Sequence, residues 1–569
     1  MTKARTLLVC VVLLAAGAAL RALLWHPFDV RGPEPPDSRR RASGVLHVHS
    51  VHSDGVGDVD EIVAAAKRAR LDFVIITDHN DFDLKPQERY SDGVLVIVGT
   101  EISTRSGHVL GLGVPEPTFR FTDDAAEVFE DVDHLGGLAM VAHPMSPESD
   151  FQWRGWDLPG SWGIELLNGD SQWRAAPWPA VMGSAFNYPL DSSYALLNVL
   201  TLPDEARQQW DRLLITRNVP MVVGSDAHGG VRLGSRVTLP VPSYEALFRV
   251  AQNHVLLDEP LSGDAARDAA AIVSSLRRGR GYVALDALAP GSGFFFNAES
   301  GSQRWDMGDT VSLSSSPVLR AGGQVPDGST VTLQRNGDVI SRNEEALSWH
   351  VMAPGVYRVE VNAPGWDAPW IVSNPIYVFD PAEQEVRRQR SLIPVRDLPR
   401  PKLMVDNFES ASSFESGSDA STVVDRNVTD VKGGMDGSRA ARLSFQLSPP
   451  TAEIPSPFAA LVRLRPDDLS GSLGLTFLVR SDREYRVWVQ VRDENTRSED
   501  GTEWWYASVR SAPEWRRVAI PFQQFRTRDP ASDGRLNLDK ARGIVFILDS
   551  GVAKPGTRGV IWIDDVGVY

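Results

Sequence analysis

Cysteine is almost absent from this sequence, and basic residues are fewer than acidic ones. The 569 residues include a single cysteine, Cys10, and 58 lysines and arginines against 74 aspartates and glutamates give a formal net charge of -16. The rest of the chain therefore has no thiol and no disulfide, which is compatible with export but does not require it. The charge argues against a general nucleic-acid binder, which usually presents a basic face, and leaves room for a local basic pocket for an anionic substrate. No Ser-His or Cys-His nucleophile pattern is present.

The N-terminus has the pattern of an export signal. Two basic residues precede the apolar run Leu7–Leu20, as in the first two regions of a signal peptide. The run is shorter than the roughly 20 residues that span a membrane, although the apolar residues after Arg21 extend it. Residues 1–26 are therefore either a cleaved signal peptide or a signal-anchor in the inner membrane, and residues 27–43 form a Pro- and Arg-rich tether. We expect a protein that is periplasmic, secreted or anchored to the outer face of the cytoplasmic membrane.

The hydrophobic pattern divides the rest of the chain. At about 150 residues per domain, this length predicts three or four domains. Short apolar runs alternate with helical stretches across residues 44–290, which is typical of an α/β sheet or barrel with buried parallel strands. Alternating strands and a hairpin signal at Asn336-Gly337 predict a small, immunoglobulin-like β-sandwich at 291–380. A polar linker at 381–401 and a second all-β sandwich, a jelly roll, at 402–569 complete the chain.

Histidine is scarce, with 11 in the chain, yet most potential metal ligands accompany the apolar runs of residues 44–290. Alternate side chains of a strand point to the same face, so His47 and His49 should converge. In a parallel α/β barrel the carboxyl ends of the strands share one face, where catalytic groups collect. The side chains predicted to meet there are His47, His49, Asp54, His79, Glu101, His108, His143, Asp226 and His228.

These ligands are too numerous for one ion. At about four ligands per ion they indicate two or three divalent metals, and nitrogen and oxygen ligands do not distinguish manganese, zinc and iron. Asp78 is interpreted as an outer carboxylate or a structural cap, because its neighbour His79 has the better claim to be a metal ligand. The alternative, a set of buried hydrogen-bonded histidines, requires each one to find a partner at the same rim. The residues expected to act in catalysis are Asp54, Glu101, His143 and His228.

The motifs "LHVHSVHSDG", "TDHN", "GTEIST" with "GHVLGLG", "VAHP" and "GSDAH" occur in this order. Together they resemble the polymerase and histidinol phosphatase (PHP) family of metallohydrolases, over about Gly44 to Ala289. The resemblance implies a distorted seven-stranded β/α barrel with a site for two or three ions. Some phosphatases of the family place a histidine near the position of Asp54, so occupancy of a third ion site is an open point. The implied ligands are His47, His49, Glu101 and Asp226 for one ion, Glu101, His108 and His143 for a second, and Asp54, His79 and His228 for a third.

The substrate is less constrained by the sequence. Exported members of the family with added β domains resemble the carbaryl-hydrolase-like metallohydrolases. Metal-bound hydroxide suits phosphoester cleavage, which is the function we favour, but it would also attack a carboxylic ester, carbamate or amide. Arg105 is a candidate for binding an anionic substrate, with a solvated surface arginine as the alternative. The Trp-rich insert at 152–210, including Trp153, would either wall a small-molecule pocket or pack on a neighbouring sandwich.

The C-terminal region, from "VDNFES" to "IDDVGVY", resembles the galactose-binding-like jelly rolls of carbohydrate-binding modules. Trp488 lies among polar residues in "YRVWVQVR", where it would stack on a sugar ring or pack under a loop with Trp504 and Trp505. The alternative to an enzyme is therefore an envelope carbohydrate-binding protein whose barrel is non-catalytic. The expected partners are a small-molecule ester, favoured to be phosphorylated, and a glycan, with no nucleic acid.

Export leads to a test in cells. If the signal interpretation is right, residues from about Pro27 onward lie outside the cytoplasm. A reporter enzyme that is active only in the cytoplasm, fused after Arg41, should then be silent. Strong reporter activity would contradict export, and the mass of the mature N-terminus distinguishes a cleaved signal from an anchor.

Overall fold

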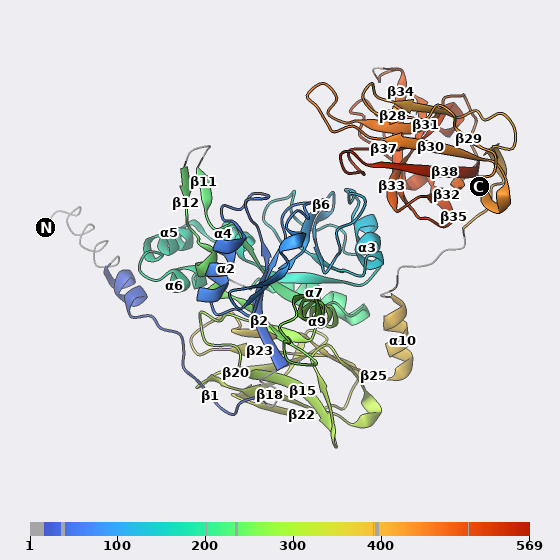
Figure 1. Cartoon of the computed structure of the whole chain (residues 1–569). Coiled ribbons are helices and arrows are strands. Elements are labelled where there is room, and N and C mark those ends of the chain that lie inside the picture. Colours follow the sequence, from blue (N-terminus) through green and yellow to red (C-terminus); the bar gives the residue numbers. More distant parts are fainter. Residues whose placement is uncertain are drawn as a thin grey trace. The chain divides into compact units, whose positions relative to one another are not determined.

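The structure, a computed structural model, describes residues 16–35, 40–200, 202–233, 237–390, 392, 398–498 and 500–569. The chain forms two compact units (Figure 1). One contains the residues up to Glu116 together with Asp123–Pro394, and the other contains Pro117–Thr122 and Val395–Tyr569. Most of the predicted export signal lies outside the described residues. Among the helices that the structure describes, none is long and apolar enough to cross a membrane.

A closed sheet lies at the centre of the first unit. The strands that carry the predicted apolar runs are β2 (Arg41–Val48), β3 (Phe73–Ile76), β5 (Val94–Val98), β7 (Gly107–Leu112), β8 (Leu138–Val141), β9 (Trp162–Asn168) and β10 (Met221–Ala227). A further strand of the sheet, β6 (Thr100–Thr104), pairs with β7. β2 pairs in parallel with β3 and with β10, and the second pairing closes the sheet. β3, β5 and β8 are buried along their whole length, as their continuous apolar sequences predict.

The closed sheet extends beyond these strands. β13 (Gln252–Leu256) pairs with β2, and β14 (Gly281–Ala284) pairs with β13, both antiparallel. The same sheet then continues into the middle region of the chain. The structure therefore does not isolate the seven-stranded barrel that the family resemblance implies.

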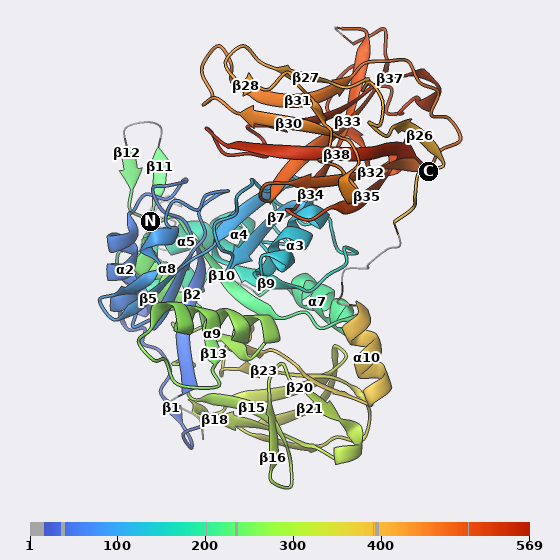
Figure 2. The same ribbon diagram turned by 45° about the vertical axis from the view of Figure 1, so that its right-hand side comes forward.

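Helices pack on the outside of the strands (Figure 2). Two predicted helices, α2 (Val59–Arg68) and α9 (Ala265–Arg278), begin after Asp58 and Asp264, whose carboxylates accept hydrogen bonds from backbone N–H groups of the first turn. The Trp-rich insert, predicted as loops and short helices, supplies further helices. The remaining helices used below are α3 (Ala125–His134), α4 (Gly169–Ala175), α5 (Trp178–Asn187), α6 (Ser192–Leu197), α7 (Asp204–Thr216) and α8 (Tyr244–Val250).

The middle sandwich shares main-chain hydrogen bonds with the barrel. Its separate four-stranded sheet has the order β16-β15-β18-β22. Strands β17, β20, β21, β23, β24 and β25 belong to the closed sheet, which β24 joins by pairing with β14. The predicted hairpin joins β20 and β21 at Asn336-Gly337, which have positive φ angles of 54° and 88°. The strand bounds are β15 (Phe294–Ser300), β16 (Gln303–Asp306), β17 (Thr310–Ser312), β18 (Val318–Gly323), β20 (Thr330–Arg335), β21 (Asp338–Glu344), β22 (Leu347–His350), β23 (Gly355–Asn362), β24 (Ile371–Ser373) and β25 (Ile376–Phe379).

Both segments predicted as connectors carry secondary structure. In the tether, β1 (Val30–Arg31) pairs with β19 (Val325–Pro326). In the linker, α10 (Pro381–Arg390) packs by way of Arg387, which is 2% exposed. Its guanidinium donates hydrogen bonds to backbone carbonyls at the end of α7, which lies far away in the sequence. The polar composition of this segment predicted a linker, because the partners of Arg387 are not local in the sequence.

The second unit is an all-β sandwich, as predicted for residues 402–569. One sheet has the order β28-β30-β38-β32-β35 and the other the order β27-β31-β37-β33-β34-β36. Phe477 and Phe546, one from each sheet, meet edge to face in the core with ring centroids 4.9 Å apart. The strand bounds are β27 (Glu415–Ser418), β28 (Val423–Val424), β30 (Ala440–Gln446), β31 (Phe458–Arg463), β32 (Gly474–Ser481), β33 (Tyr485–Glu494), β34 (Thr502–Ser511), β35 (Arg516–Pro521), β36 (Arg526–Thr527), β37 (Ala541–Asp549) and β38 (Arg558–Val568).

Replacing Arg387 should destabilise the first unit. Arg387→Ala leaves the last carbonyls of α7 without their donor, and we expect a loss of about 3 kcal/mol in the free energy of unfolding. Arg388→Ala is the matched control, because Arg388 is exposed and pairs with Glu385 on the surface of the same helix, and it should change little. Urea unfolding measures both, and equal effects would contradict the structural role of Arg387.

Candidate metal centre

The predicted ligands converge at one rim of the closed sheet. Most of them follow or end parallel strands, but β7 runs antiparallel between β6 and β8. This reversal brings His108, at the start of β7, to the rim where the other strands end. The ligands from the strands and the residues just after them are His47 and His49 (β2), His79 (β3), Glu101 (β6), His108 (β7), His143 (β8), and Asp226 and His228 (β10).

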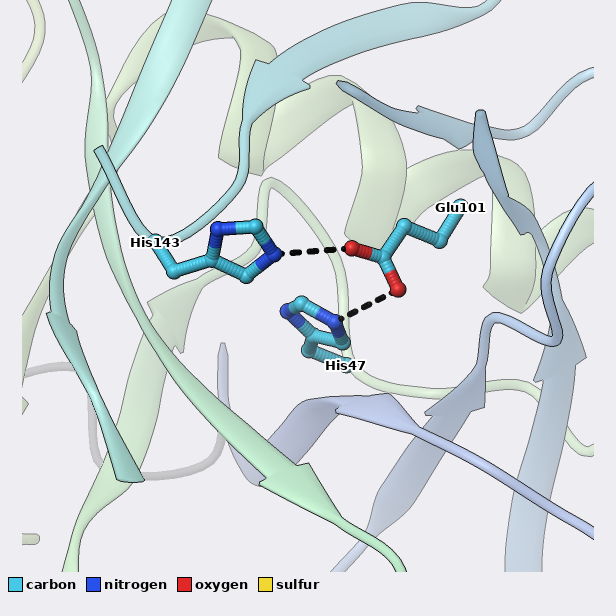
Figure 3. Close-up of side chains that lie close together, drawn as sticks. All are labelled: His47, Glu101 and His143. Atoms are coloured by element: carbon cyan, nitrogen blue, oxygen red, sulfur yellow. Dashed lines mark hydrogen bonds and ion pairs between the residues drawn. The ribbon is translucent and has the colours of Figure 1, made fainter. Parts of the chain in front are cut away.

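Glu101 is the centre of the cluster (Figure 3). Its Oε1 atom lies 2.7 Å from Nδ1 of His108 and 2.9 Å from Nε2 of His143. Its Oε2 atom lies 3.1 Å from Nε2 of His47. The side chain of Glu101 is 1% exposed. The two oxygens of Glu101 thus face different imidazoles. This arrangement is expected of a carboxylate that would bridge two cations.

Further ligands face Glu101 from the neighbouring strands. Its Oε2 atom is 3.2 Å from Nε2 of His49 and 3.3 Å from Nδ1 of His79. Oδ1 of Asp226 lies 3.3 Å from Nε2 of His49 and 3.5 Å from Nε2 of His47. The triad of His47, His49 and Asp226 therefore has all its ligand atoms within 4.8 Å of one another.

The cluster has a buried floor and an open edge. His47 and His49 are fully buried, whereas the side chains of Asp54, His79 and His228 are 54%, 30% and 26% exposed. Oδ2 of Asp54 lies 3.3 Å from Nε2 of His228 and 3.7 Å from Nε2 of His79. A substrate can therefore reach the cluster at the edge formed by these three side chains.

The donor atoms fit divalent cations. Nε2 of His47, Nε2 of His49 and Nδ1 of His79 are buried and make no hydrogen bond of acceptable geometry to any residue that the structure describes. An unsatisfied buried polar atom costs about 1–3 kcal/mol, so three of them aimed at one carboxylate indicate a missing partner. Imidazole nitrogens and carboxylate oxygens are common ligands of zinc and related ions.

Hydrogen bonds on the far sides of three rings support this interpretation. Nδ1 of His47 donates to Oε1 of Glu165 at 2.7 Å, and Nδ1 of His143 donates to the carbonyl of Phe151 at 3.2 Å. Nδ1 of His228 donates to the carbonyl of Asp226 at 3.0 Å. These contacts fix the tautomer that leaves Nε2 of each ring for a cation, as is usual for metal-bound histidine.

The electrostatics of the floor also favour positive charge. Burial by itself would lower the pKa of His49, but the neighbouring carboxylates of Asp226 and Glu101 raise that pKa to about 10. Burial by itself would raise the pKa of Glu101, but the charge of His47 and hydrogen bonds from His108 hold it well below its usual range. Both shifts have one cause, the mutual attraction of buried carboxylates and imidazoles, and metal ions would take the place of the protons there.

Three of these residues have a strained backbone. The φ angles of His47, His143 and Asp226 are 61°, 31° and 49°. Left-handed backbone in a residue other than glycine is uncommon, costs roughly 1–3 kcal/mol and clusters at functional sites. The strain aims each side chain into the rim at the point where its strand ends.

Sequence reasoning missed Glu165, which supports the cluster from behind. Glu165 lies on β9 and is 1% exposed. Its Oε1 atom accepts from the ring of His47, and its Oε2 atom accepts from the backbone N–H of His143 at 2.7 Å and from Nδ2 of Asn168 at 3.0 Å. The signal was a carboxylate inside the otherwise apolar run "GIELL", where a buried charge needs partners.

Asp78 lies beside the cluster rather than within it. Its carboxylate accepts hydrogen bonds from the backbone N–H of Ser50 at 2.8 Å and from the hydroxyl groups of Ser50 and Ser53 at 2.6 and 2.5 Å. It therefore holds the loop between His49 and Asp54. The sequence predicted an outer carboxylate or a structural cap at this position, and Asp78 belongs to none of the groups of metal-ligand type among the described residues.

The residues predicted to bind substrate lie elsewhere. Arg105 pairs with Asp123 and Asp124. Trp153 is 2% exposed and packs on Phe129, with ring centroids 5.7 Å apart. Neither residue lines the cleft at the open edge of the cluster.

A cleft of about 460 Å³ opens at this edge. It is lined by Asp54, Asp226 and His228 from the cluster, and by Arg174 and Arg232 on its walls. The other lining residues are Gly169, Asp170, Trp173, Gly229, Gly230, Val231, Pro242 and Leu247. Trp173 is thus the tryptophan of the insert that walls the cleft.

In the second unit, Trp488 is half-buried on β33. Its Nε1 atom donates to Oδ1 of Asp549 at 3.1 Å, and its ring lies edge to face with Tyr506 at 5.3 Å. Trp505 is buried, and Trp504 is 44% exposed beneath the guanidinium of Arg492. Trp488 and Tyr506 therefore form an aromatic pair on one face of their sheet.

Comparisons with known proteins give a curated relative and several solved structures. The chain is 32% identical over 117 residues to the uncharacterized protein MJ1587 of Methanocaldococcus jannaschii, a match that covers 18% of this chain and 67% of that protein. It is 18% identical, with a TM-score of 0.30, to a two-domain protein from Bacteroides vulgatus that contains a predicted PHP-like metal-dependent phosphoesterase, covering 61% of this chain and 99% of that one. It is also 23% identical, with a TM-score of 0.25, to a family 11 carbohydrate-binding module from Clostridium thermocellum. That match covers 30% of this chain and 96% of the module. No protein-family model matches the chain.

Glu165→Gln should weaken metal binding without removing a ligand. The amide keeps the size of the side chain but is a poorer acceptor for Nδ1 of His47, and loss of such a support typically costs roughly 10- to 100-fold in metal affinity. Titration of the metal-free protein with zinc or manganese measures the effect.

The matched control is Asp286→Asn. Asp286 pairs with a buried histidine, His254, at 2.9 Å, and neither residue belongs to a group of metal-ligand type among the described residues. Its metal affinity should stay at the wild-type value. Equal losses in both variants would show that Glu165 has no particular connection to the metal centre.

Proposed function

We propose that this chain, which belongs to the same family as the uncharacterized protein MJ1587 of Methanocaldococcus jannaschii, is a metal-dependent phosphoesterase that acts outside the cytoplasm. The observation that carries the proposal is the cluster around Glu101, in which five imidazoles face one buried carboxylate beneath an open cleft. A set of merely structural histidines would have its buried nitrogens satisfied by the protein.

The cluster supports a site for two or three ions. Four overlapping groups of ligand atoms, each within 4.8 Å, share residues of the buried floor. These groups are His47, Glu101 and His143; His47, His49 and Asp226; His49, His79 and Glu101; and His49, Asp54 and His228. When bound, divalent ions supply an activated water and charge stabilisation for an anionic transition state.

The protein's own residues would prepare that chemistry in three ways. Glu101 and Asp226 offset the charge of the cations within the buried floor. Glu165 holds the ring of His47 so that its Nε2 atom faces the centre. Asp54, on the open edge, would hold the ion nearest to the cleft and so act where the substrate enters.

Two arginines in the walls of the cleft support an anionic substrate. Arg174 and Arg232 both line the cleft, and arginine suits the recognition of phosphate oxygens. Arg174 is held by Asp170 at 2.5 Å and by Glu148 at 2.6 Å, and Arg232 donates to the carbonyl of Gly55 at 2.6 Å. These two residues replace Arg105 as the candidates for binding the phosphate.

Two further functions accompany the main proposal. Trp173, Pro242 and Leu247 give the cleft an apolar side, which favours hydrolysis of a carboxylic ester or carbamate as the alternative activity. In the second unit, the half-buried pair of Trp488 and Tyr506 supports glycan binding by aromatic stacking.

The activity can be tested with a panel of substrates. The metal-reconstituted protein should hydrolyse an aryl phosphate faster than an aryl phosphodiester, an aryl acetate or an aryl carbamate. Glu101→Gln should lower this activity by more than the roughly 10- to 100-fold loss that is typical of supporting residues, because one oxygen of the bridging carboxylate is lost. Turnover of the carboxylic substrates alone would replace the phosphoesterase proposal with its alternative. Less than one metal ion per chain after reconstitution would remove the enzyme proposal.

Asp54→Ala tests the ion at the open edge. We expect it to reduce aryl phosphate hydrolysis and to lower the number of bound ions, while the buried floor keeps its own metal. Asp327→Ala is the control, because Asp327 is an exposed carboxylate that pairs with Arg31 and belongs to no group of metal-ligand type among the described residues. Metal analysis and initial rates measure both variants. If Asp54→Ala behaves as Asp327→Ala does, the site has two ions at most.

A further inference from the structure

A second cavity, of about 140 Å³, lies next to the metal cleft. It lies between β9 and β10 on one side and helices α5, α6 and α8 on the other. Leu167 and Val223 line it from the strands, and Val181, Leu196 and Val250 line it from the helices. Apolar side chains of this kind bind an apolar group and give no reason for a charged one to enter.

The cavity borders the cleft. Gly169, Trp173, Pro242 and Leu247 line both spaces. Nε1 of Trp173 donates to Oδ1 of Asp170 at 2.9 Å, so the polar atom of the indole is satisfied and its ring is fixed between the two spaces. A molecule with its reacting group in the cleft can therefore extend an apolar part into the cavity.

One polar atom in the lining has no partner. Ser225 is 8% exposed and lines the cavity. Its buried hydroxyl makes no hydrogen bond to any of the residues that the structure describes. Ser225 directly precedes Asp226, so this hydroxyl lies one residue from the metal cluster. A buried hydroxyl without a partner is unfavourable, and a ligand with one hydrogen-bonding atom would satisfy it.

The volume limits the size of the occupant. An apolar protein cavity of about 150 Å³ accommodates one benzene molecule. A neighbouring space of about 20 Å³, which shares Leu167 and Val223 with this cavity but has no lining residue in common with the cleft, is far too small for such a group.

We propose that this cavity is the subsite for the apolar part of the substrate, a group with the volume of one ring and one hydrogen-bonding atom. The assignment rests on the proposed function, because the reacting phosphate is placed at the metal cluster. The substrate class is then a phosphate ester of a small apolar alcohol or phenol, in contrast to a sugar phosphate or a nucleotide, whose polar groups the cavity would leave unpaired.

Non-hydrolysable phosphonates test the cavity without requiring turnover. Calorimetric titration of the full-length, metal-reconstituted protein compares phenylphosphonate with methylphosphonate, which share the anionic group but differ in the ring. We expect phenylphosphonate to bind roughly 30-fold more tightly, as expected for burial of one aromatic ring. A ratio below about 3-fold would overturn the cavity assignment.

Filling variants locate the preference in this cavity. Val181→Phe places a ring in the cavity from α5 and should bring the ratio close to 1. Met182→Phe is the matched control, because Met182, the residue after Val181, is 50% exposed and does not line the cavity. This control should keep the wild-type ratio of the two phosphonate affinities. Leu196→Phe fills the cavity from α6 and provides a second test should the first variant fail to fold. A ratio that survives both filling substitutions would overturn the assignment.

Failure of the two proposals gives different results. If both phosphonates bind, with equal affinity, and the protein hydrolyses aryl and alkyl phosphates alike, the cavity assignment is wrong and the phosphoesterase proposal stands. If neither phosphonate binds to the metal-loaded protein, the phosphoesterase proposal is wrong and the cavity assignment falls with it. Ser225→Ala adds a finer test, because it should weaken the binding of a hydroxyphenylphosphonate more than that of phenylphosphonate if the free hydroxyl contacts the ligand.

Discussion

The carboxylate of Glu101 is buried among five imidazoles, and the rest of the first unit is organised around this contact. A buried anion is costly unless positive charge and hydrogen bonds surround it. Its partners come from β2, β3, β7 and β8, so the sheet must close for them to meet at one point. The closed sheet and the charged centre therefore depend on each other.

The geometry is maintained against backbone strain. His47 and His143 both have left-handed φ angles, and one side chain, Glu165, holds both of them: it accepts from the ring of His47 and from the backbone N–H of His143. Asn168, which also begins α4 with its side-chain cap, donates to the same carboxylate. A residue that touches no expected substrate thus fixes two strained ligands, and the strained positions keep their imidazoles oriented before any cation binds.

The sequence predicted the parts of this site that depend on local pattern. The spacing of His47 and His49 and the residues after each apolar run indicated side chains that do cluster around Glu101, because strand alternation and strand ends are local properties. Glu165 was missed because its partners are distant in the sequence, and the reversal of β7, which explains His108, cannot be read from an apolar run. Arg105 was a candidate for binding the substrate because it lies near His108 in the sequence, but it does not line the cleft, whose walls come from segments that are distant in the sequence.

The same limit explains the domain pattern. The change of texture near residue 290 is real in the sequence, yet β14 pairs with β24 across it, so hydrogen bonds make the barrel sheet and the middle sandwich continuous. The predicted linker contains α10, whose Arg387 satisfies carbonyls on α7. Composition describes the surface that each segment presents, whereas the partner that covers a segment depends on the complete fold.

Strand β10 connects the polar and the apolar sides of the site. Asp226 contributes to the buried cluster, while Ser225, the residue before it, lines the apolar cavity beneath the helices. Side chains of neighbouring strand residues point to opposite faces, so a single strand can separate a centre for cations from a space without charge. A molecule that carries an anionic group next to an apolar one meets both environments at the end of β10. Selectivity in such a site comes from the apolar side, because the attraction of a metal centre for anions is common to every phosphate ester.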